Sequence, residues 1–425
     1  MAQVAQTSAL GSVAWEAEDS FADADDDTIT TRMQVRDEQI DVSGLTRELM
    51  NRGGAFQYLA EGDFDAVGAF GASTFSTSFY LHGHGGVTTG SLTQTDLCKL
   101  LAHVFGNVDV SQVGTTCSAG WDANTGDVAS GAGLVSGGML RIGELGDGAA
   151  EGQYLAVTTV ATNTVTLATD APGSPVASDV VYVPQMLYPV STAATAGQIT
   201  SDGSTSNNTL RFLLQTANLA FVCRGCVATG VSFELGVGNL PRITIEWTCA
   251  AWNPVSATFP NATASASKCG SPITAGSTYL QAKGTTTRAT EVEADFAMTF
   301  DTGILPLFGQ GGTTEGQTIV GYRRGRNRTT VSFSVESETV TATPEWHDYF
   351  ATDPNSQVAK HILWTGSVVD GRAIGIYFRN CKPIGNVPTQ TPVDGLNRVA
   401  VEFECMTDTA GADELRKAPW VLALG

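Results

Sequence analysis

The sequence predicts a mainly β protein with two tandem β-sandwich or β-barrel domains, each with a short helix, and a small inserted β-barrel. Three observations support this prediction. Strand-like segments outnumber helical ones, the middle of the chain has its own group of short strands, and two blocks of sequence recur at one spacing. At roughly 150 residues per domain, a chain of 425 residues accommodates two or three domains.

Most strand-like segments alternate apolar residues with polar or small ones. This pattern is typical of antiparallel sheets that bury one face and expose the other. The clearest examples are Phe75–Leu81, Leu210–Leu214, Val231–Leu235, Ile243–Trp247, Phe296–Phe300, Val331–Val335, Ile362–Trp364, Ile374–Phe378 and Val399–Phe403. We therefore expect antiparallel sheets to dominate the fold.

Helical patterns are few. The best covers Thr93–Phe105, where leucine and valine residues share one face, Thr93 or Thr95 can cap the start, and a glycine follows the end. A second, short helix is expected at Pro344–Phe350, because proline suits a first helical turn. Weaker helical patterns cover Val35–Met50 and Ala410–Lys417.

The segment from about residue 116 to 189 differs from its surroundings. It is rich in glycine at first, and four short strand patterns follow. These are Met139–Ile142, Tyr154–Val160, Thr164–Ala168 and Val180–Val183. Residues 161–163 offer a tight turn between two of them. The segment therefore predicts a small β-barrel inserted into a larger domain.

Two blocks of sequence recur at almost the same spacing. Arg224-Gly225-Cys226 recurs 155 residues later as Arg379-Asn380-Cys381. The block RITIEWTC recurs 156 residues later as RVAVEFEC, which aligns Arg242, Trp247 and Cys249 with Arg398, Phe403 and Cys405. Because solenoid repeats have periods of roughly 20–50 residues, this spacing indicates a duplicated domain instead.

The repeat and the insertion together predict the domain boundaries. Residues 1–34 form an N-terminal arm, and residues 35–115 with 190–265 form the first domain. Residues 116–189 form the inserted β domain, and residues 266–425 form the second copy of the repeated domain.

The composition is acidic but poor in charge. The chain has 43 Asp and Glu against 23 Lys and Arg, a net charge of −20, and 47 glycines. Tight binding to a nucleic-acid backbone requires clustered basic residues, so this balance argues against it. The one dense basic run, Arg323, Arg324, Arg326 and Arg328, is expected to be a solvated loop or an ion-pairing patch.

Targeting signals and membrane spans are not expected. The first 20 residues contain no Lys or Arg and no apolar core of signal-peptide length, so we expect no secretory signal. No stretch approaches the ~18 apolar residues that a membrane helix needs. Without a secretory signal, the eight cysteines are expected to be mainly reduced.

The cysteines of the repeat allow more than one interpretation. Cys223 and Cys226 form a C-x-x-C pair, but no second pair at zinc spacing accompanies it, so a zinc site is not favoured. Alternating strands would bring Cys226 near Cys249 and Cys381 near Cys405 as small core residues. Disulfides between these partners stay an open alternative.

No motif indicates catalysis. His82 and His84 form the only close histidine pair and are expected in a surface loop, with metal ligation as the alternative. Metalloprotease, nucleophile-elbow and phosphate-loop motifs do not occur. The acidic cluster Asp23–Asp27 lacks an EF-hand frame, and Gly131-Ala132-Gly133 lacks the dinucleotide spacing. We expect no enzyme, no cofactor and no metal site.

The combination of these features resembles the tail tube proteins, also called major tail proteins, of long-tailed bacteriophages. The resemblance rests on the strand-helix-strand order, the R-x-C strand and the R-[IV]-x-[IV]-E-[WF] strand in both copies. The stretch Glu293–Glu336 and the insertion at 116–189 are also similar to features of that family. The resemblance covers most of the chain after about Gln34, and it supplies no catalytic residues to transfer.

The resemblance implies a structural virion protein. Such β domains join edge to edge into rings, and the rings stack into the hollow tube through which viral DNA is ejected. Members with a duplicated domain look like homotrimers with pseudo-sixfold symmetry, so a trimer is expected here and a homohexamer is the alternative. The implied partners are further copies, the tape measure protein, the tail terminator and tail tip proteins, and DNA that passes without specific binding. Assembly is expected in the host cytoplasm and the final location in the virion.

A long loop is the candidate for ring stacking. The segment from Gly44 to Ser73 carries Phe56, Tyr58, Phe64 and Phe70, and loops of this length usually have a function. We expect it to order against the next ring, with an internally packed hairpin as the alternative. For the whole chain the alternatives are another tail, baseplate or capsid-decorating β protein, a surface or carbohydrate-binding module, or an enzyme.

Overall fold

The computed structural model describes the following parts of the chain. They are residues 12–18, 21–22, 29, 31–32, 39–45, 48–51, 64–67, 73–81, 87–88, 91–92, 95–108, 114–142, 154–171, 175–189, 209–216, 219–235, 240–255, 277–282, 290–292, 296–310, 317–336, 359–366, 373–385, 390–393, 396–407 and 414–425.

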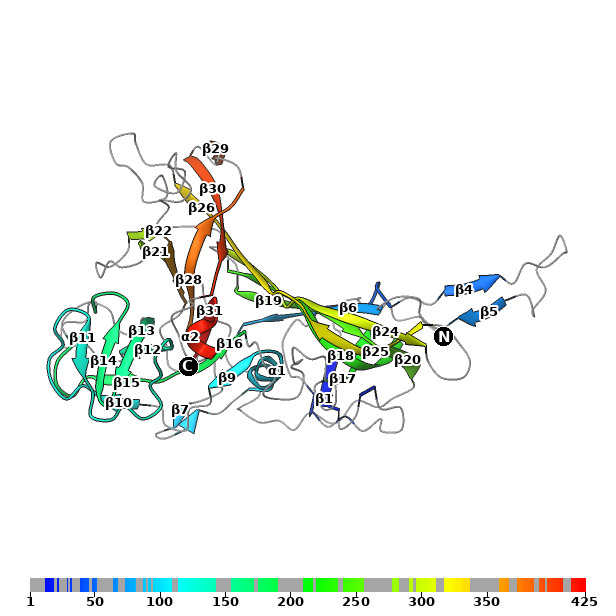
Figure 1. Ribbon diagram of the computed structural model, residues 1–425, viewed down its shortest axis with the longest axis horizontal. Helices are drawn as coiled ribbons and strands as arrows, with labels where there is room; N and C mark the ends of the chain where they lie inside the picture. The colour runs from blue at the N-terminus through cyan, green and yellow to red at the C-terminus, as the bar shows by residue number, and fades with distance from the viewer. Residues whose placement is uncertain are drawn as a thin grey trace, which may run out of the picture.

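The protein is mainly β, and its largest sheet is antiparallel (Figure 1). The described part of the chain contains two helices, α1 (Asp96–Val104) and α2 (Glu414–Lys417). The sheet includes β1 (Ser12–Ala17), β2 (Thr31–Arg32), β3 (Gln39–Asp41), β6 (Ser73–Tyr80), β9 (Gly106–Val108), β16 (Gln185–Tyr188), β17 (Leu210–Thr216), β18 (Leu219–Glu234), β19 (Arg242–Cys249), β20 (Ala251–Val255), β21 (Ser277–Ala282), β22 (Thr290–Val292), β23 (Ala297–Asp301), β26 (Arg328–Glu336), β27 (Lys360–Thr365), β28 (Ile374–Pro383), β29 (Gln390–Val393), β30 (Leu396–Cys405) and β31 (Trp420–Leu424).

Three short hairpins stand outside this sheet. They are β4 (Glu48–Asn51) with β5 (Phe64–Val67), β7 (Val87–Thr88) with β8 (Ser91–Leu92), and β24 (Ile304–Gln310) with β25 (Gln317–Arg324). In Figure 1 the β4–β5 hairpin projects from one end of the molecule, whereas β24 and β25 lie close to β18 and β20.

A single large hydrophobic core lies under one face of the sheet. Helix α1 contributes Leu97, Leu100 and Leu101, which are fully or almost fully buried. Thr95 caps this helix, because its hydroxyl accepts a hydrogen bond from the Cys98 amide at 3.2 Å. Trp420 makes edge contacts with Phe105, Phe233 and Phe300, so the core joins strands from both halves of the chain.

The internal sequence repeat coincides with a repeat of strand pairing. Asp41 of β3 pairs with Ser76 of β6, and Ala297 of β23 pairs with Ser332 of β26, so both partners are shifted by 256 residues. The β6–β19 and β26–β30 pairings also correspond, because Trp247 lies opposite Phe75 and Phe403 lies opposite Val331. The order β3-β6-β19-β18 is thus matched by β23-β26-β30-β28.

The two groups share a β-bulge as well. In the first group, Leu210 pairs with Cys226 and Phe212 pairs with Cys223. In the second, Lys360 pairs with Cys381 and Ile362 pairs with Phe378, with the same shift of register. A bulge gives one strand an extra residue and bends it, so the two strands β18 and β28 deviate at the same point.

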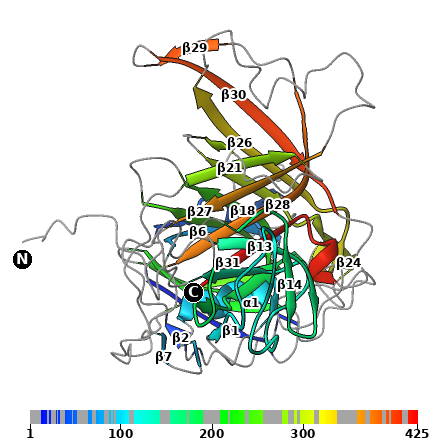
Figure 2. The same ribbon diagram turned by 90° about the vertical axis from the view of Figure 1, so that its left-hand side faces the viewer.

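The segment from 114 to 182 forms a separate six-stranded sheet. Its order is β10 (Gly114–Thr116), β15 (Val180–Tyr182), β12 (Met139–Ile142), β13 (Tyr154–Ala161), β14 (Thr164–Leu167) and β11 (Thr125–Asp127). A hydrophobic cluster of its own lies within it, centred on Leu140, Val165 and Val181. This sheet lies at the left-hand end of the molecule in Figure 1, and in Figure 2 it faces the viewer, below β29 and β30.

Most sequence predictions of individual elements are confirmed. The named strands are all present, α1 begins after Thr95, and α2 lies within the weak pattern at Ala410–Lys417. The weak helical pattern at Val35–Met50 was wrong, since this segment contains β3 and β4. Ile40 packs against the core while its neighbours pair with β6, and this tertiary pairing overrides local propensity. The helix predicted at Pro344–Phe350 lies outside the described residues.

Candidate functional site

The large sheet has a polar face, and it is the candidate functional surface. Residues that pair directly across strands point to the same face, so each row of paired residues can be followed from strand to strand. One such row crosses six strands and consists of Ser78, Thr244, Ser232, Thr299, Thr330 and Glu404. The next row contains Tyr80, Arg242, Glu234, Ala297, Ser332 and Glu402.

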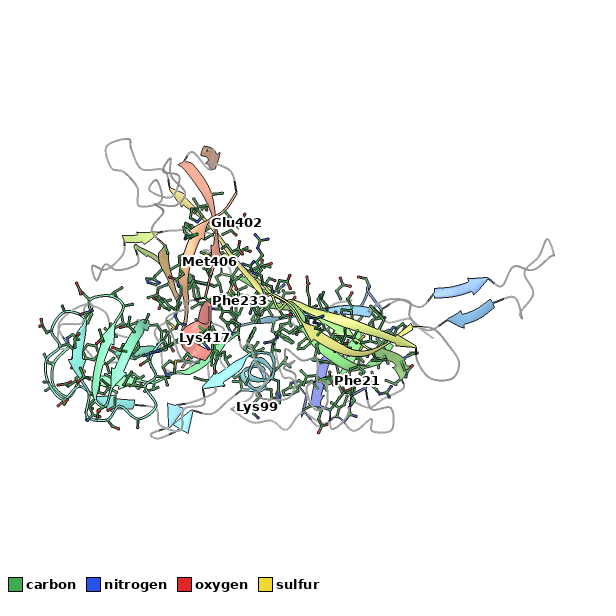
Figure 3. All side chains as sticks on the ribbon, in the orientation of Figure 1. Phe21, Lys99, Phe233, Glu402, Met406 and Lys417 are labelled. Atoms are coloured by element: carbon green, nitrogen blue, oxygen red, sulfur yellow. The ribbon has the colours of Figure 1, made fainter. Side chains whose placement is uncertain are left out.

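Alternation along each strand separates this polar face from the core. In β19, Ile243, Ile245 and Trp247 are fully buried, whereas Glu246 is exposed. The same pattern holds in β30, where Val401 and Phe403 are buried and Glu402 is exposed. Figure 3 labels Glu402 on the sheet and Phe233 in the core beneath it. The sheet therefore presents a continuous hydrophilic surface over a dry interior.

The charge of this surface is predominantly acidic. Its described carboxylates include Asp41, Glu234, Glu246, Asp301, Glu402 and Glu404. Three basic residues balance part of this charge: Arg242 lies over the Tyr80 ring at 4.8 Å, Arg328 lies 3.5 Å from Glu404, and Lys382 of β28 pairs with Glu404 across the strands. The remaining positions carry mainly hydroxyl groups, and Ser78 and Thr244 share a hydrogen bond of 2.8 Å. Such a surface repels phosphate groups instead of binding them.

The 19-stranded sheet is branched, and among the described residues six of its strands, β2, β3, β9, β20, β22 and β29, have one partner each. Among the described residues, β3 pairs only with β6 and β29 pairs only with β30. Unpaired strand edges expose backbone donors and acceptors, which makes them templates for pairing with another chain. The molecule thus has one open edge at each end of the order β3-β6-β19-β18-β23-β26-β30-β29.

The hairpin β24–β25 carries an exposed apolar group. Its inner side packs Ile304, Ile319 and Tyr322 against Val227 of β18. Leu305, Leu307, Phe308 and Val320 are exposed, with Leu305 at 60% of its full surface. Four large exposed apolar residues on one hairpin are typical of a contact surface for another protein.

The hairpin β4–β5 occupies the corresponding place in the first group. It lies between β3 and β6 as β24–β25 lies between β23 and β26, and Glu48 and Ile304, at which β4 and β24 begin, are 256 residues apart. Phe64 is the first residue of β5. Phe56, Tyr58 and Phe70 lie outside the described residues, so the predicted stacking contacts stay predictions.

The bulge of β18 is held by the N-terminal strand. The Glu18 carboxylate accepts hydrogen bonds from the Gly225 amide at 2.8 Å, the Ala22 amide at 3.2 Å and the Thr209 hydroxyl. Burial raises the pKa of Glu18, although these hydrogen bonds oppose the shift. Tyr322 donates its hydroxyl to the Gly225 carbonyl at 2.6 Å, so the hairpin β24–β25 meets the same bulge.

The bulge of β28 is held differently. The Arg379 guanidinium donates to the carbonyls of Leu415, Arg416 and Ala418 at the end of α2, and to the carbonyl of Gly137. Tyr154 lies against Gly375, where a Cβ would approach the Tyr154 ring to 2.8 Å. These contacts fix the six-stranded sheet against the second group of strands.

The cysteines of the repeat are buried thiols. Cys226, Cys249, Cys381 and Cys405 belong to the main core, and the Cys381 and Cys405 sulfur atoms are 3.2 Å apart without a bond. Burial raises the pKa of Cys226 and of Cys405, so these thiols stay protonated and unreactive at neutral pH. Within the described residues, no group of three or more His, Cys, Asp and Glu side chains could hold a metal ion.

Other residues that the sequence singled out lie apart from this surface or outside the described residues. His82, His84 and the acidic cluster Asp23–Asp27 lie outside the described residues. Arg323, Arg326 and Arg328 are exposed near the end of β25 and the start of β26. Gly133 occupies a turn of the 114–182 segment, with φ of 82°. Within the described chain, neither helix is long and apolar enough to cross a membrane.

Comparisons with known proteins provide no family assignment. No protein-family model matches the chain, and no curated protein matches it in sequence.

The acidic face was not identified from the sequence. Its signal was nevertheless present, because the same strands that carry buried aromatics carry Ser, Thr and Glu at every second position. The exposed apolar residues of β24–β25 were also not predicted. The run Ile304 to Phe308 is nevertheless unusually apolar for a segment between the two predicted strands Phe296–Phe300 and Val331–Val335. In both cases strand pairing was needed to show which residues share a surface.

Proposed function

We propose that this protein is the tail tube protein of a long-tailed bacteriophage, which assembles into stacked rings around a channel for DNA. The observation that supports this most strongly is the repeated strand pairing. It extends the sequence repeat to two four-stranded groups with matching register and a shared bulge. Two tandem tail-tube-like domains, at 35–115 with 190–265 and at 266–425, account for this arrangement.

The repeat also supports a trimeric ring. Three chains with two equivalent groups each would give a ring with pseudo-sixfold symmetry. The open edges of β3 and β29 lie at opposite ends of the strand order that runs from β3 to β29, and such a head-to-tail arrangement generates a ring when the rotation closes. Ring closure would protect both edges from uncontrolled aggregation.

The acidic sheet face is the proposed wall of the channel. Glu246 and Glu402 hold the same position in the two copies and both are exposed. A wall of carboxylates and hydroxyls would let a polyanion pass without the counterion release that makes basic surfaces bind DNA. The main core and α1 lie behind this face, and the inserted β-barrel at 116–189 would decorate the outside of the tube.

The hairpins are the proposed contacts between rings. The exposed apolar group on β24–β25 supports this for the second copy. For the first copy, the loop that carries Phe56, Tyr58, Phe64 and Phe70 is expected to contact the next ring. Removing residues 52–70 should leave soluble protein that forms rings but does not stack, and unchanged tubes would refute this role.

Electron microscopy of the purified protein, together with its mass in solution, tests the proposal as a whole. Hollow rings or tubes with three chains per ring are expected. A protein that stays monomeric after seeding with tail tips would favour a surface-binding module or another virion component instead.

A further inference from the structure

The junction between the two repeats inside one chain shows how two chains can join. Within the chain, β18 of the first group pairs with β23 of the second, so that Phe233 lies opposite Met298 and Glu234 lies opposite Ala297. This junction turns two groups of strands into one continuous sheet. Within the described residues, the equivalents of these two strands, β29 and β3, lie at opposite ends of the order β3-β6-β19-β18-β23-β26-β30-β29, so they do not pair with each other within one chain.

The strand register shows which residues would pair if the equivalents of β18 and β23 joined two different chains. Ala297 of β23 corresponds to Asp41 of β3, because they pair with Ser332 and Ser76, which are 256 residues apart. Glu234 of β18 pairs with Arg242, whose counterpart Arg398 pairs with Thr391 of β29. Thr391 therefore holds the place of Glu234 in the second group. By the same steps, Gln390 holds the place of Phe233 and Val42 that of Met298.

We propose that β29 of one copy pairs antiparallel with β3 of the next copy, with Thr391 opposite Asp41 and Gln390 opposite Val42. This inference rests on the ring assembly proposed above and specifies its lateral contact. The occupant of each open edge is a second copy of this chain, because the chain itself contains the complementary edge in the equivalent place. The sheet and its acidic face then continue across the boundary between chains.

A hydrogen bond of the internal junction shows which residues of the proposed pairing form hydrogen-bonded pairs and which do not. The Leu235 amide donates to the Phe296 carbonyl at 2.8 Å, so Phe296 directs its backbone groups toward β18. In an antiparallel strand, every second residue directs its backbone N–H and C=O groups toward the same neighbouring strand. Met298 therefore directs its backbone groups toward β18, and Ala297 does not. In β3 the corresponding residues are Ile40 and Val42. Asp41 and Thr391 consequently form a non-hydrogen-bonded pair, with Cα atoms about 4.5 Å apart.

The hairpins extend the same argument. In the internal junction, β24–β25 lies against β18 near its bulge, with Tyr322 bonded to the Gly225 carbonyl. Its counterpart β4–β5 projects from the end of the molecule (Figure 1). Pairing of β3 with the next copy would bring the base of β4–β5 toward β28 of that copy, where the equivalent bulge lies at Asn380, whereas the stacking role proposed above concerns the loop that joins β4 to β5.

Disulfide trapping tests the pairing directly. Asp41→Cys combined with Thr391→Cys is oxidised with copper phenanthroline under conditions in which rings form. A non-hydrogen-bonded pair has a Cα distance that suits a disulfide, which needs about 4.4–6.8 Å. The expected products are covalent oligomers on a non-reducing gel, ending at the number of chains in one ring. Each single cysteine variant controls for the native thiols.

The internal junction supplies a matched control. Glu234→Cys combined with Ala297→Cys should form a disulfide within one chain, which changes gel mobility but not mass. Rings that are visible by electron microscopy but give no intermolecular product, while this internal pair closes, would overturn the proposed pairing and leave the ring function standing. Absence of rings under every condition would overturn both.

A second variant tests the pairing without new thiols. Val42→Pro removes an amide that is expected to point toward the next copy, and Val42→Ala keeps that amide while shortening the side chain. Val42→Pro should be folded, as judged by circular dichroism, yet at least tenfold poorer in ring formation than Val42→Ala. Equal ring formation by the two variants would contradict the proposal.

Discussion

Gly225 and Asn380 occupy the same place in two strands of the sheet, and both have the left-handed backbone conformation, with φ of 61° and 47°. Each is the residue between the Arg and the Cys of the repeated R-x-C block, and each lies at the bulge that the strands share. A left-handed residue is common for Gly and tolerated by Asn, whereas other residues are strained there. One backbone requirement therefore explains why the repeat has Gly at this position in one copy and Asn in the other.

Substitutions at the two bulges should have unequal effects. Gly225→Ala should cost about 1–3 kcal/mol, because the backbone is left-handed and the new Cβ would meet the Ala250 Cβ at 2.7 Å. Asn380→Gly should change stability by less than about 1 kcal/mol, since glycine adopts this conformation freely. Urea unfolding of both variants measures this, and a larger loss for Asn380→Gly than for Gly225→Ala would contradict it.

The buried Trp247 depends on one hydroxyl. Its indole donates to the Thr77 hydroxyl at 2.9 Å, and both residues are fully buried. Thr77→Val should destabilise the protein by about 1–3 kcal/mol, because it leaves a buried donor unsatisfied. Thr77→Ser keeps the acceptor and is the matched control. The denaturant midpoints of wild type and Thr77→Ser should be higher than that of Thr77→Val. The reverse order would contradict a stabilising role for this hydrogen bond.

Much of the fold could be predicted from local pattern, but its pairing could not. Alternation predicted the strand that contains Trp247, and the leucines at one face predicted α1. The pairing of β18 with β23 joins residues about 65 apart through no local signal, and it places Glu234 beside Ala297. The acidic face depends on such pairings, which explains why its residues were recognised only from the structure. The same limit explains the wrong helix at Val35–Met50.

Glu18 should make stability depend on pH. Burial raises the pKa of Glu18 above its ordinary value of 4.5, so the folded protein holds this proton more tightly than the unfolded chain. The contribution of Glu18 is therefore fully favourable below the ordinary value and is lost as the pH rises through the folded pKa. The difference in melting temperature between wild type and Glu18→Gln should change in favour of Glu18→Gln as the pH rises from 4.5 to 7.5. A difference that does not vary with pH would contradict the burial argument.

Reversing the charge of the acidic face should create DNA binding. Glu246→Lys with Glu402→Lys replaces two exposed carboxylates at equivalent positions by amines. Assembled tubes of this variant should retain duplex DNA, with an affinity that falls steeply between about 50 and 200 mM salt. Asp122→Lys with Asp127→Lys, in the 114–182 segment, adds the same amount of positive charge elsewhere and controls for net charge. Equal DNA retention by both variants would show that the acidic face is not the channel wall.

The exposed apolar group on β24–β25 should affect assembly more than folding. Leu305→Ser with Leu307→Ser changes two exposed side chains, so the free energy of unfolding should change by less than about 1 kcal/mol. If the group contacts the next ring, the variant should form rings that stack poorly, as seen by electron microscopy and by sedimentation. Val176→Ser, which changes an exposed apolar residue of the 114–182 segment, is the control. Tubes of normal length would contradict a contact between the exposed apolar residues of β24–β25 and the next ring.

The central claim is that this chain is a ring-forming tube protein with two equivalent domains. Its most direct test is electron microscopy of the assembled protein, with class averages examined for symmetry and mass measured on the same sample. The account predicts hollow rings of three chains with pseudo-sixfold symmetry, stacked into tubes whose wall exposes Glu246 and Glu402. A stable monomer that forms no rings after seeding with tail tips would contradict it.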